Sequence, residues 1–170
     1  DRVVQKLLAL ALAAILGAIS TGSLAAKVTE KTEYYSVSGK TGGELVRSMM
    51  RKGPRHGFLS KAIAVTRFKA SPYGDLAYKN GACRTKGAGF ALQISYVFPR
   101  PSEKLPADVS ARWRPFIAGV KKHEKAHGRI GAQMAAEIDG KIRGFAMKDK
   151  PDCRKAMATV VTDVSAIVKK

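Results

Sequence analysis

The sequence contains few residues of the kinds that bind metals or form covalent cross-links. It has two cysteines and three histidines among 170 residues. Two cysteines exclude a fold held together by many disulfides, and the absence of a CxxC pair argues against zinc bound to cysteines. Metal chemistry in this chain would therefore have to come from a small set of histidines and carboxylates.

Long apolar runs are also missing, except for one near the start of the chain. Arg2 and Lys6 precede an uninterrupted apolar segment, residues 7–19, which is followed by small and polar residues up to Ala26. This order predicts a secretory signal peptide over residues 1–26. The alternative is an uncleaved anchor, although the run is shorter than the about 20 residues that a membrane span needs.

Residues 27–170 then form a single domain. The apolar content of the whole chain is 45%, which is sufficient to build a core. We expect a periplasmic or secreted protein with no membrane span once the signal peptide has been cleaved. In such an oxidising compartment Cys83 and Cys153 are expected to pair. The alternative is that both cysteines are unpaired thiols buried in the core.

Acidic residues are scarce, with 13 Asp and Glu against 31 Lys and Arg, which gives a net charge of +18. Such a field attracts anionic surfaces, so an anionic envelope surface is a possible partner. The basic residues are scattered along the chain and form none of the nucleic-acid-binding motifs, so nucleic acid is an unlikely partner. The plain alternative is a well-solvated cationic surface.

The first half of the domain is typical of strand-rich structure. The best strand covers residues 90–98, where apolar side chains alternate at period two. Residues 71–75, which include Pro72 and Gly74, predict a turn. Strands are expected over residues 34–38, 62–68, 76–83 and 90–98.

Helices are expected in three places. Thr41 and Glu44 have the spacing of a capping box and predict a short helix through Met50. A long helix and a C-terminal helix over residues 154–169 follow from apolar residues at spacings of three and four. The fold class is therefore α+β, with a small antiparallel-type sheet packed on both later helices. The buried stripe of the long helix is predicted to consist of Trp113, Phe116, Ile117, Val120, Ile130, Met134, Ile138, Ile142 and Phe145.

The stripe is interrupted by the sequence His123-Glu124-Lys125-Ala126-His127, an HExxH motif. Two histidines four residues apart on a helix differ by about 40° in direction, so their imidazoles can converge on one ion. Zn²⁺ bound by His123 and His127 would activate a water molecule, and Glu124 would act as the general base. This pattern predicts a zinc peptidase acting on a peptide or protein substrate. The alternative is a pair of core histidines.

The third metal ligand is left open by the sequence. The metzincin pattern would require Gly at position 130 and His at position 133, where this chain has Ile130 and Gln133. Glu137 shares the histidine face, but it lies about 15 Å further along a straight helix. The candidates are Glu137, Asp163, Asp152, Asp75, Glu103 and His56.

Between about Tyr34 and Phe145, the chain resembles a bacterial family of predicted secreted zinc-dependent proteases, catalogued as domain of unknown function 922. The resemblance implies that His123 and His127 bind the metal and that Glu124 is the base. The adjacent residues Lys121, Lys122 and Lys125 are expected to point away from the apolar stripe. The resemblance rests on residues 35–41, Leu45, Met49-Met50, Gly53-Pro54, Cys83, the strand ending at Pro99 and Trp113.

The alternative function is that of a non-catalytic, cationic cell-envelope protein. Such a protein would retain the fold and bind anionic polymers or metal. By analogy with zincins, we also expect the strand over residues 90–98 to border the cleft and to pair with an extended peptide.

Overall fold

A computed structural model describes residues 26–56 and 60–168 of the chain. The predicted signal peptide, residues 1–26, lies outside the described part except for Ala26. The elements in chain order are β1 (Lys27–Val37), α2 (Gly42–Lys52), β2 (Arg55–His56), β3 (Ser60–Lys61), β4 (Val65–Lys79), β5 (Ala82–Pro101), α3 (Ala107–Gly144), β6 (Ala146–Met147) and α4 (Arg154–Val168).

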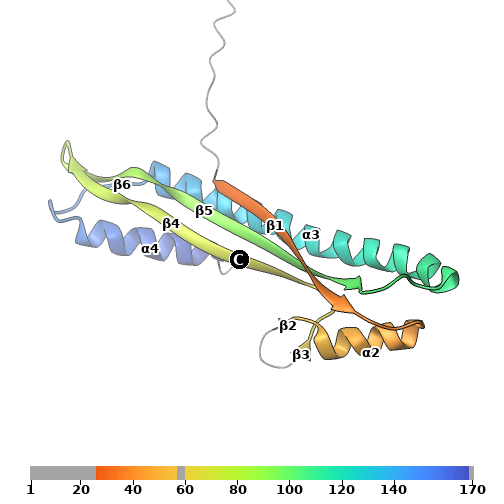
Figure 1. The fold of residues 1–170 in the computed structure, drawn as a ribbon. Helices are drawn as coiled ribbons and strands as arrows, with labels where there is room; N and C mark the ends of the chain where they lie inside the picture. Colours follow the sequence, from red (N-terminus) through yellow and green to blue (C-terminus); the bar gives the residue numbers. More distant parts are fainter. Residues whose placement is uncertain (1–25, 57–59, 169–170) are drawn as a thin grey trace, which may run out of the picture.

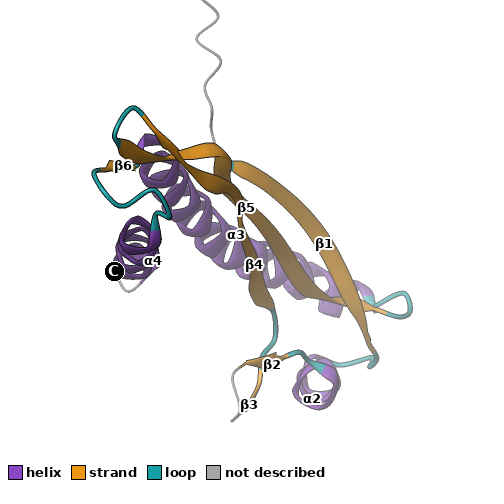
Figure 2. Ribbon diagram, turned by 90° about the vertical axis from the view of Figure 1, so that its left-hand side faces the viewer, coloured by secondary structure: helices purple, strands orange, loops and turns teal. Residues whose placement is uncertain are grey.

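The main sheet is organised around β5, which lies between β1 and β4. β4 and β6 pair with β5 antiparallel, whereas β1 pairs with it parallel. A parallel pair needs a long connection, which α2, β2, β3 and β4 provide here. In Figure 1 the sheet lies in front of α3, and Figure 2 shows α3 and α4 on the same side of the sheet. The predicted α+β class, with a sheet on a long helix and a C-terminal helix, is confirmed.

The turn predicted over residues 71–75 is wrong, because β4 continues through this segment. The pairing register shifts between Tyr73 and Asp75, as at a β-bulge. Gly74 has φ +100° and takes up the irregular conformation. Pro72 is tolerated since β4 lies at the edge of the sheet, where a missing N–H breaks no ladder. Turn-forming residues here mark a bulge instead of a chain reversal.

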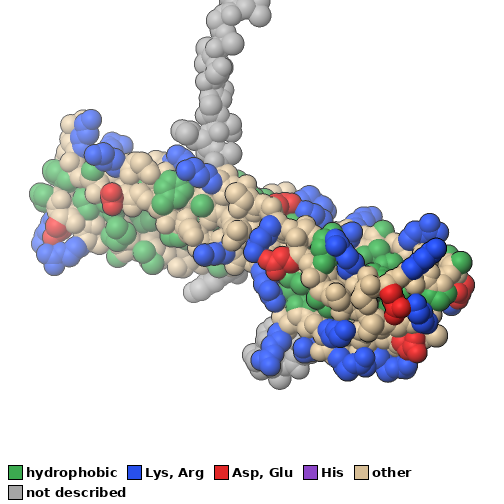
Figure 3. Space-filling view, in the orientation of Figure 1, with side chains coloured by type: hydrophobic (Ala, Val, Ile, Leu, Met, Phe, Trp, Pro, Cys, Tyr) green, Lys and Arg blue, Asp and Glu red, His purple; other side chains and the backbone are tan. Residues whose placement is uncertain are grey.

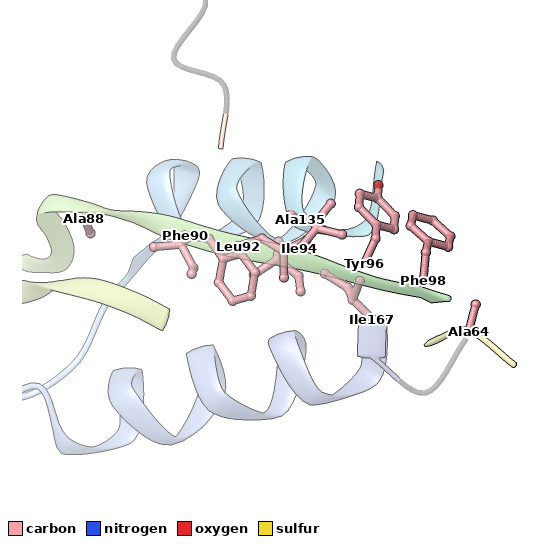
Figure 4. Close-up of a cluster of buried hydrophobic side chains, with 11 residues drawn as sticks. Ala64, Ala88, Phe90, Leu92, Ile94, Tyr96, Phe98, Ala135 and Ile167 are labelled. Carbon is pink, nitrogen blue, oxygen red and sulfur yellow. The ribbon is translucent and has the colours of Figure 1, made fainter. Parts of the chain in front are cut away.

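The hydrophobic core lies between one face of β5 and the two long helices. The alternating residues Leu92, Ile94 and Tyr96 are at most 1% exposed, as the period-two pattern predicts. They pack against α3 and α4 (Figure 4). The complete cluster of buried residues is Ala64, Ala88, Phe90, Leu92, Ile94, Tyr96, Phe98, Ala135, Ile138, Ile142 and Ile167.

The first helix begins as its sequence predicts. The Glu44 N–H donates to the Thr41 hydroxyl at 3.3 Å, and the Thr41 N–H donates to the Glu44 carboxylate at 3.1 Å. The reciprocal bonds satisfy two backbone N–H groups at the N-terminus of α2. This capping box fixes where the chain turns from β1 into the helix.

The predicted stripe of α3 is correct near its C-terminal end and wrong in the middle. Ile138 and Ile142 are buried, but Ile130 is 63% exposed. Between Val120 and Ala135 the helix instead buries Glu124, Gly128 and Gly131. Apolar character alone misplaces the stripe, because small residues are needed where the helix comes closest to the sheet.

Cys83 and Cys153 form a disulfide, with their Cα atoms 5.7 Å apart, and the predicted pairing is confirmed. The bond joins the start of β5 to the residue that precedes α4. Cys83 is fully buried and Cys153 nearly so, among Ala156, Leu76 and Phe145. Within the described residues, no helix has the length and apolar character to cross a membrane.

We expect the double substitution Cys83→Ala and Cys153→Ala to lower the free energy of unfolding by about 4 kcal/mol. The bond closes a loop across 70 positions, and closing a loop of that length removes about 4 kcal/mol of chain entropy from the unfolded state. Urea denaturation of both proteins without reductant measures the difference. An unchanged denaturation midpoint would show that the cross-link contributes nothing to stability.

Candidate metal and catalytic site

His123 and His127 lie on the same edge of α3, and their rings face each other. The two Nε2 atoms are 3.1 Å apart. The ring centroids are 4.7 Å apart, and the ring planes are nearly perpendicular, at 83°. Both side chains are exposed. Their rings therefore converge at the helix surface instead of filling the core, as the predicted spacing requires.

The separation of the two nitrogens is compatible with one shared metal ion. Two nitrogens bound to a tetrahedral ion at about 2.0–2.1 Å lie about 3.3 Å apart, which is close to the 3.1 Å between these atoms. The same separation also allows one ring to donate a hydrogen bond to the other. The pair thus offers two imidazole donors to a divalent cation with little rearrangement.

Glu124 occupies the centre of the helix face that contacts the sheet. The spacing of the stripe would place the histidines on the buried face, but Glu124 is the motif residue buried there: it is 9% exposed, and the exposed histidines lie beside it. The Thr66 hydroxyl, on β4, lies 2.6 Å from Glu124 Oε2 and 3.0 Å from the Glu124 backbone oxygen. A carboxylate is the stronger acceptor, so the single hydroxyl proton is best placed on Oε2.

The three motif residues share a pocket with the start of β4. Its volume is about 520 Å³. The opposite wall is formed mainly by small or apolar side chains, so a carbonyl group of a peptide could approach the histidines without a bulky barrier. The pocket is lined by Ala62, Ala64, Val65, Thr66, Phe68, His123, Glu124 and His127.

The structure brings none of the described candidates for the third ligand to the histidine pair. Within residues 26–56 and 60–168, no group of three His, Cys, Asp or Glu is arranged to hold a metal ion. Glu103 pairs with Lys40 at 2.6 Å, and Asp152 pairs with Arg154 at 2.8 Å.

The other candidates lie elsewhere as well. Asp75 lines a separate pocket together with Asp152, next to the disulfide. Asp163 is exposed on α4, and Glu137 is exposed on α3, more than two turns beyond His127. The His56 backbone ends β2, but its side chain lies outside the described part of the chain. Of the predicted metal ligands in the described part of the chain, His123 and His127 are the two that lie together.

On the opposite edge of α3, Lys121 and Lys125 contact aromatic rings of the sheet. The expectation that these two lysines point away from the apolar stripe is wrong. Lys125 Nζ lies 3.8 Å from the centroid of the Tyr96 ring and 2.6 Å from Glu30 Oε2. The Tyr96 hydroxyl donates to Glu30 Oε1 at 3.0 Å. Lys121 lies 5.9 Å from the ring centroids of both Tyr34 and Phe98.

These contacts change the acidity of all three polar groups. The hydrogen bond from Lys125 lowers the pKa of Glu30, and the same bond raises the pKa of Lys125. Burial, followed by the bond to Glu30, raises the pKa of Tyr96. The ion pair is nearly half exposed, so its contribution to stability is small. The pair lies on the edge of α3 that faces β1, whereas the histidines lie on the edge that faces β4.

Two glycines allow α3 to approach the sheet at the motif. A Cβ atom on Gly128 would overlap the Tyr96 hydroxyl, and one on Gly131 would overlap the Phe68 ring. Both glycines are buried. Close approach at these positions brings Thr66 within hydrogen-bonding distance of Glu124.

Sequence reasoning missed Thr66 and Tyr96. Thr66 lies between Ala64 and Phe68 at period two, and this alternation was the available signal that its hydroxyl faces the helix. Tyr96 was assigned to the apolar face of its strand, but its contact with Gly128 depends on how β5 and α3 meet. No local sequence pattern predicts how β5 packs against α3.

β5, which contains the strand expected to pair with a peptide, has no free edge where that pairing was expected. β5 is already paired with β1 on one side and with β4 on the other over residues 91–97, so it cannot accept another strand there. β1 and β4 are the edge strands of the described sheet, and Val65, Thr66 and Phe68 of β4 line the pocket. An extended peptide would therefore meet β4 first.

Comparison with known proteins gives one match. A family model described as a bacterial protein of unknown function (DUF922) matches residues 32–170. No curated protein and no solved structure matches the chain.

We expect Gly128→Ala to lower the free energy of unfolding by about 1–3 kcal/mol, because the new methyl group overlaps Tyr96. Adding Tyr96→Phe removes the overlapping oxygen, so the double variant should lose less stability than the sum of the two single variants. Denaturant unfolding of the three variants measures this coupling.

Gly140→Ala is the matched control on the same helix, since a Cβ there meets nothing within 4 Å. It should stabilise the protein by up to about 1 kcal/mol, through helix propensity alone. If Gly128→Ala behaves like Gly140→Ala, the close approach of α3 to β5 is not a constraint.

Proposed function

The chain belongs to the bacterial family of unknown function DUF922, and we propose that this member is a zinc-dependent peptidase. The family description names no activity, so the proposal rests on the site itself. The observation that carries it is the convergence of two exposed imidazole nitrogens, 3.1 Å apart, beside a buried carboxylate in a pocket. Core histidines would instead be packed away from solvent.

His123 and His127 would hold the metal through their Nε2 atoms, and further ligands would complete the coordination. When bound, zinc supplies Lewis acidity, which acidifies water and polarises a carbonyl group. Glu124 accepts the proton of a water molecule in the pocket as the peptide carbonyl is attacked, and then passes it to the leaving amine. A carboxylate next to two exposed ligands is well placed for both transfers.

Thr66 contributes by orienting the base. Its hydroxyl occupies Glu124 Oε2 at 2.6 Å, which leaves the other oxygen available for the proton. Because a buried carboxylate has few partners, a single strong bond fixes its rotamer. Thr66 is therefore a positioning residue.

The substrate would be a peptide segment in extended conformation. β4 has a free edge in the described sheet, and its first residues line the pocket. Main-chain hydrogen bonds to this edge would align the peptide, while the small side chains Ala62 and Ala64 leave room for it. A periplasmic or extracellular location is supported by the Cys83–Cys153 disulfide. The predicted signal peptide stays a prediction.

We expect the purified protein to bind zinc at a ratio near one, and His123→Ala or His127→Ala to abolish this binding. Glu124→Gln should retain zinc and lose cleavage of fluorescently labelled casein by about 10²–10⁴-fold, the usual contribution of a general base. Elemental analysis and a chelator-controlled cleavage assay give both readouts.

Lys122→Ala is the control for this experiment, since it removes an exposed side chain next to the motif. It should leave zinc content and cleavage near the wild-type values. Equal cleavage by the wild type and Glu124→Gln, or a wild type that takes up no zinc, would refute the peptidase.

Thr66→Val should lower kcat by about tenfold or more, while KM and zinc content stay near their wild-type values, because only the orientation of Glu124 is lost. Thr66→Ser retains the hydroxyl and should recover most of the activity. A change of KM alone, or a Thr66→Ser variant as weak as Thr66→Val, would mean that Thr66 acts through packing.

A further inference from the structure

The face of the sheet opposite α3 carries a regular arrangement of basic side chains. On β1, β5 and β4, alternate residues point away from the helices, and the pairing register aligns them in rows. The rows are Lys27–Ala91–Ser71, Thr29–Gln93–Lys69 and Lys31–Ser95–Arg67. Lys27, Lys31, Arg67 and Lys69 are all exposed.

We call these three rows the trough, because uncharged side chains on β5 lie between longer cationic ones on β1 and β4. Ala91, Gln93 and Ser95 are uncharged and lie between the cationic residues of β1 and β4. Lys27, at one end, reaches across β5 to the ring of Tyr73 on β4, with Nζ 5.1 Å from the ring centroid. The two outer strands lie about 10 Å apart, and successive rows lie about 7 Å apart. These dimensions match one extended polymer chain, whose anionic groups would face cations on β1 and β4.

The trough keeps its positive charge because little acid faces it. Glu33, one row further along β1, pairs with Lys31 at 2.5 Å, and this contact lowers the pKa of Glu33. Among the described residues, Lys27 and Lys69 form no ion pair. Figure 3 views this side of the molecule, where Lys and Arg side chains are far more common than Asp and Glu.

We propose that this trough binds a linear, phosphate-bearing polymer that carries no bases. Charge complementarity supplies the attraction. The planar guanidinium of Arg67 suits phosphate, and the Gln93 amide and Ser95 hydroxyl on β5 can donate hydrogen bonds.

Two other polyanionic partners fit less well. Single-stranded nucleic acid is held by aromatic side chains that stack on its bases, and the three rows contain no aromatic residue. Tyr73 lies in the next row of β4, but Lys27 Nζ covers its ring, 5.1 Å from the centroid. Membrane surfaces favour an apolar face that enters the lipid, which these rows also lack.

The trough and the histidine pocket lie on opposite faces of the sheet. Thr66 and Phe68 point toward α3, while Arg67 and Lys69 on the same strand point away from it. A polymer in the trough would hold the protein at an anionic matrix and leave the pocket free. The binding is independent of catalysis and does not rest on the proposed peptidase activity.

The test compares Arg67→Gln/Lys69→Gln with Lys141→Gln/Lys148→Gln, which removes the same charge from exposed positions outside the trough. Binding of the full chain to inorganic polyphosphate is titrated over a salt series, and thermal melting verifies the fold of each variant. The trough variant should bind about tenfold or more weaker and show a shallower salt dependence, by about 1.5 in the log–log slope. The control variant should bind nearly like the wild type.

Parallel titrations use single-stranded DNA, alginate and phosphatidylglycerol vesicles as probes. Tighter binding of the wild type to any of these than to polyphosphate overturns the assignment of the polymer. Equal losses in both double variants overturn the trough, because the affinity would then come from diffuse charge. Glu124→Gln should bind polyphosphate like the wild type, so failure of the peptidase proposal would leave this result unchanged.

Discussion

The close approach of α3 to the sheet at Gly128 and Gly131 is the constraint on which the candidate site depends. With a side chain at either position, the helix would have to lie further from Tyr96 and Phe68. The hydroxyl of Thr66 would then no longer reach Glu124. The same approach lets Lys125 stack on Tyr96 and bond to Glu30 on one edge of the helix. The histidines on the other edge line the pocket.

The sequence predicts the parts of this site that depend on one helix, and it misses those that depend on two elements. The convergence of His123 and His127 follows from helical spacing alone, and the geometry agrees with it. The burial of Glu124 and the role of Thr66 arise from how β4 meets α3, which no periodicity encodes. For the same reason Ile130 was assigned to the core, although the helix buries glycines there.

The strands show a similar division. Alternation predicts the buried face of β5 correctly, yet it gives no information about which strands flank it. The analogy with zincins predicts that the strand over residues 90–98 pairs with a peptide, but β5 has a neighbour on each side over residues 91–97 and no free edge there. Pro72 and Gly74 indicate a turn by composition, and only the pairing register distinguishes that turn from a bulge in a continuous strand.

The parallel pairing of β1 with β5 has a consequence for the order of assembly. β1 is synthesised before the other strands of the described sheet, but its partner begins only after α2 and β4. Until then β1 has nothing to pair with, and Cys83 must wait longer still for Cys153. Such non-local contacts slow folding, so the nascent chain would expose an unpaired strand and a free thiol for much of its maturation. The disulfide can therefore form only after the segment that leads into the last helix has been synthesised.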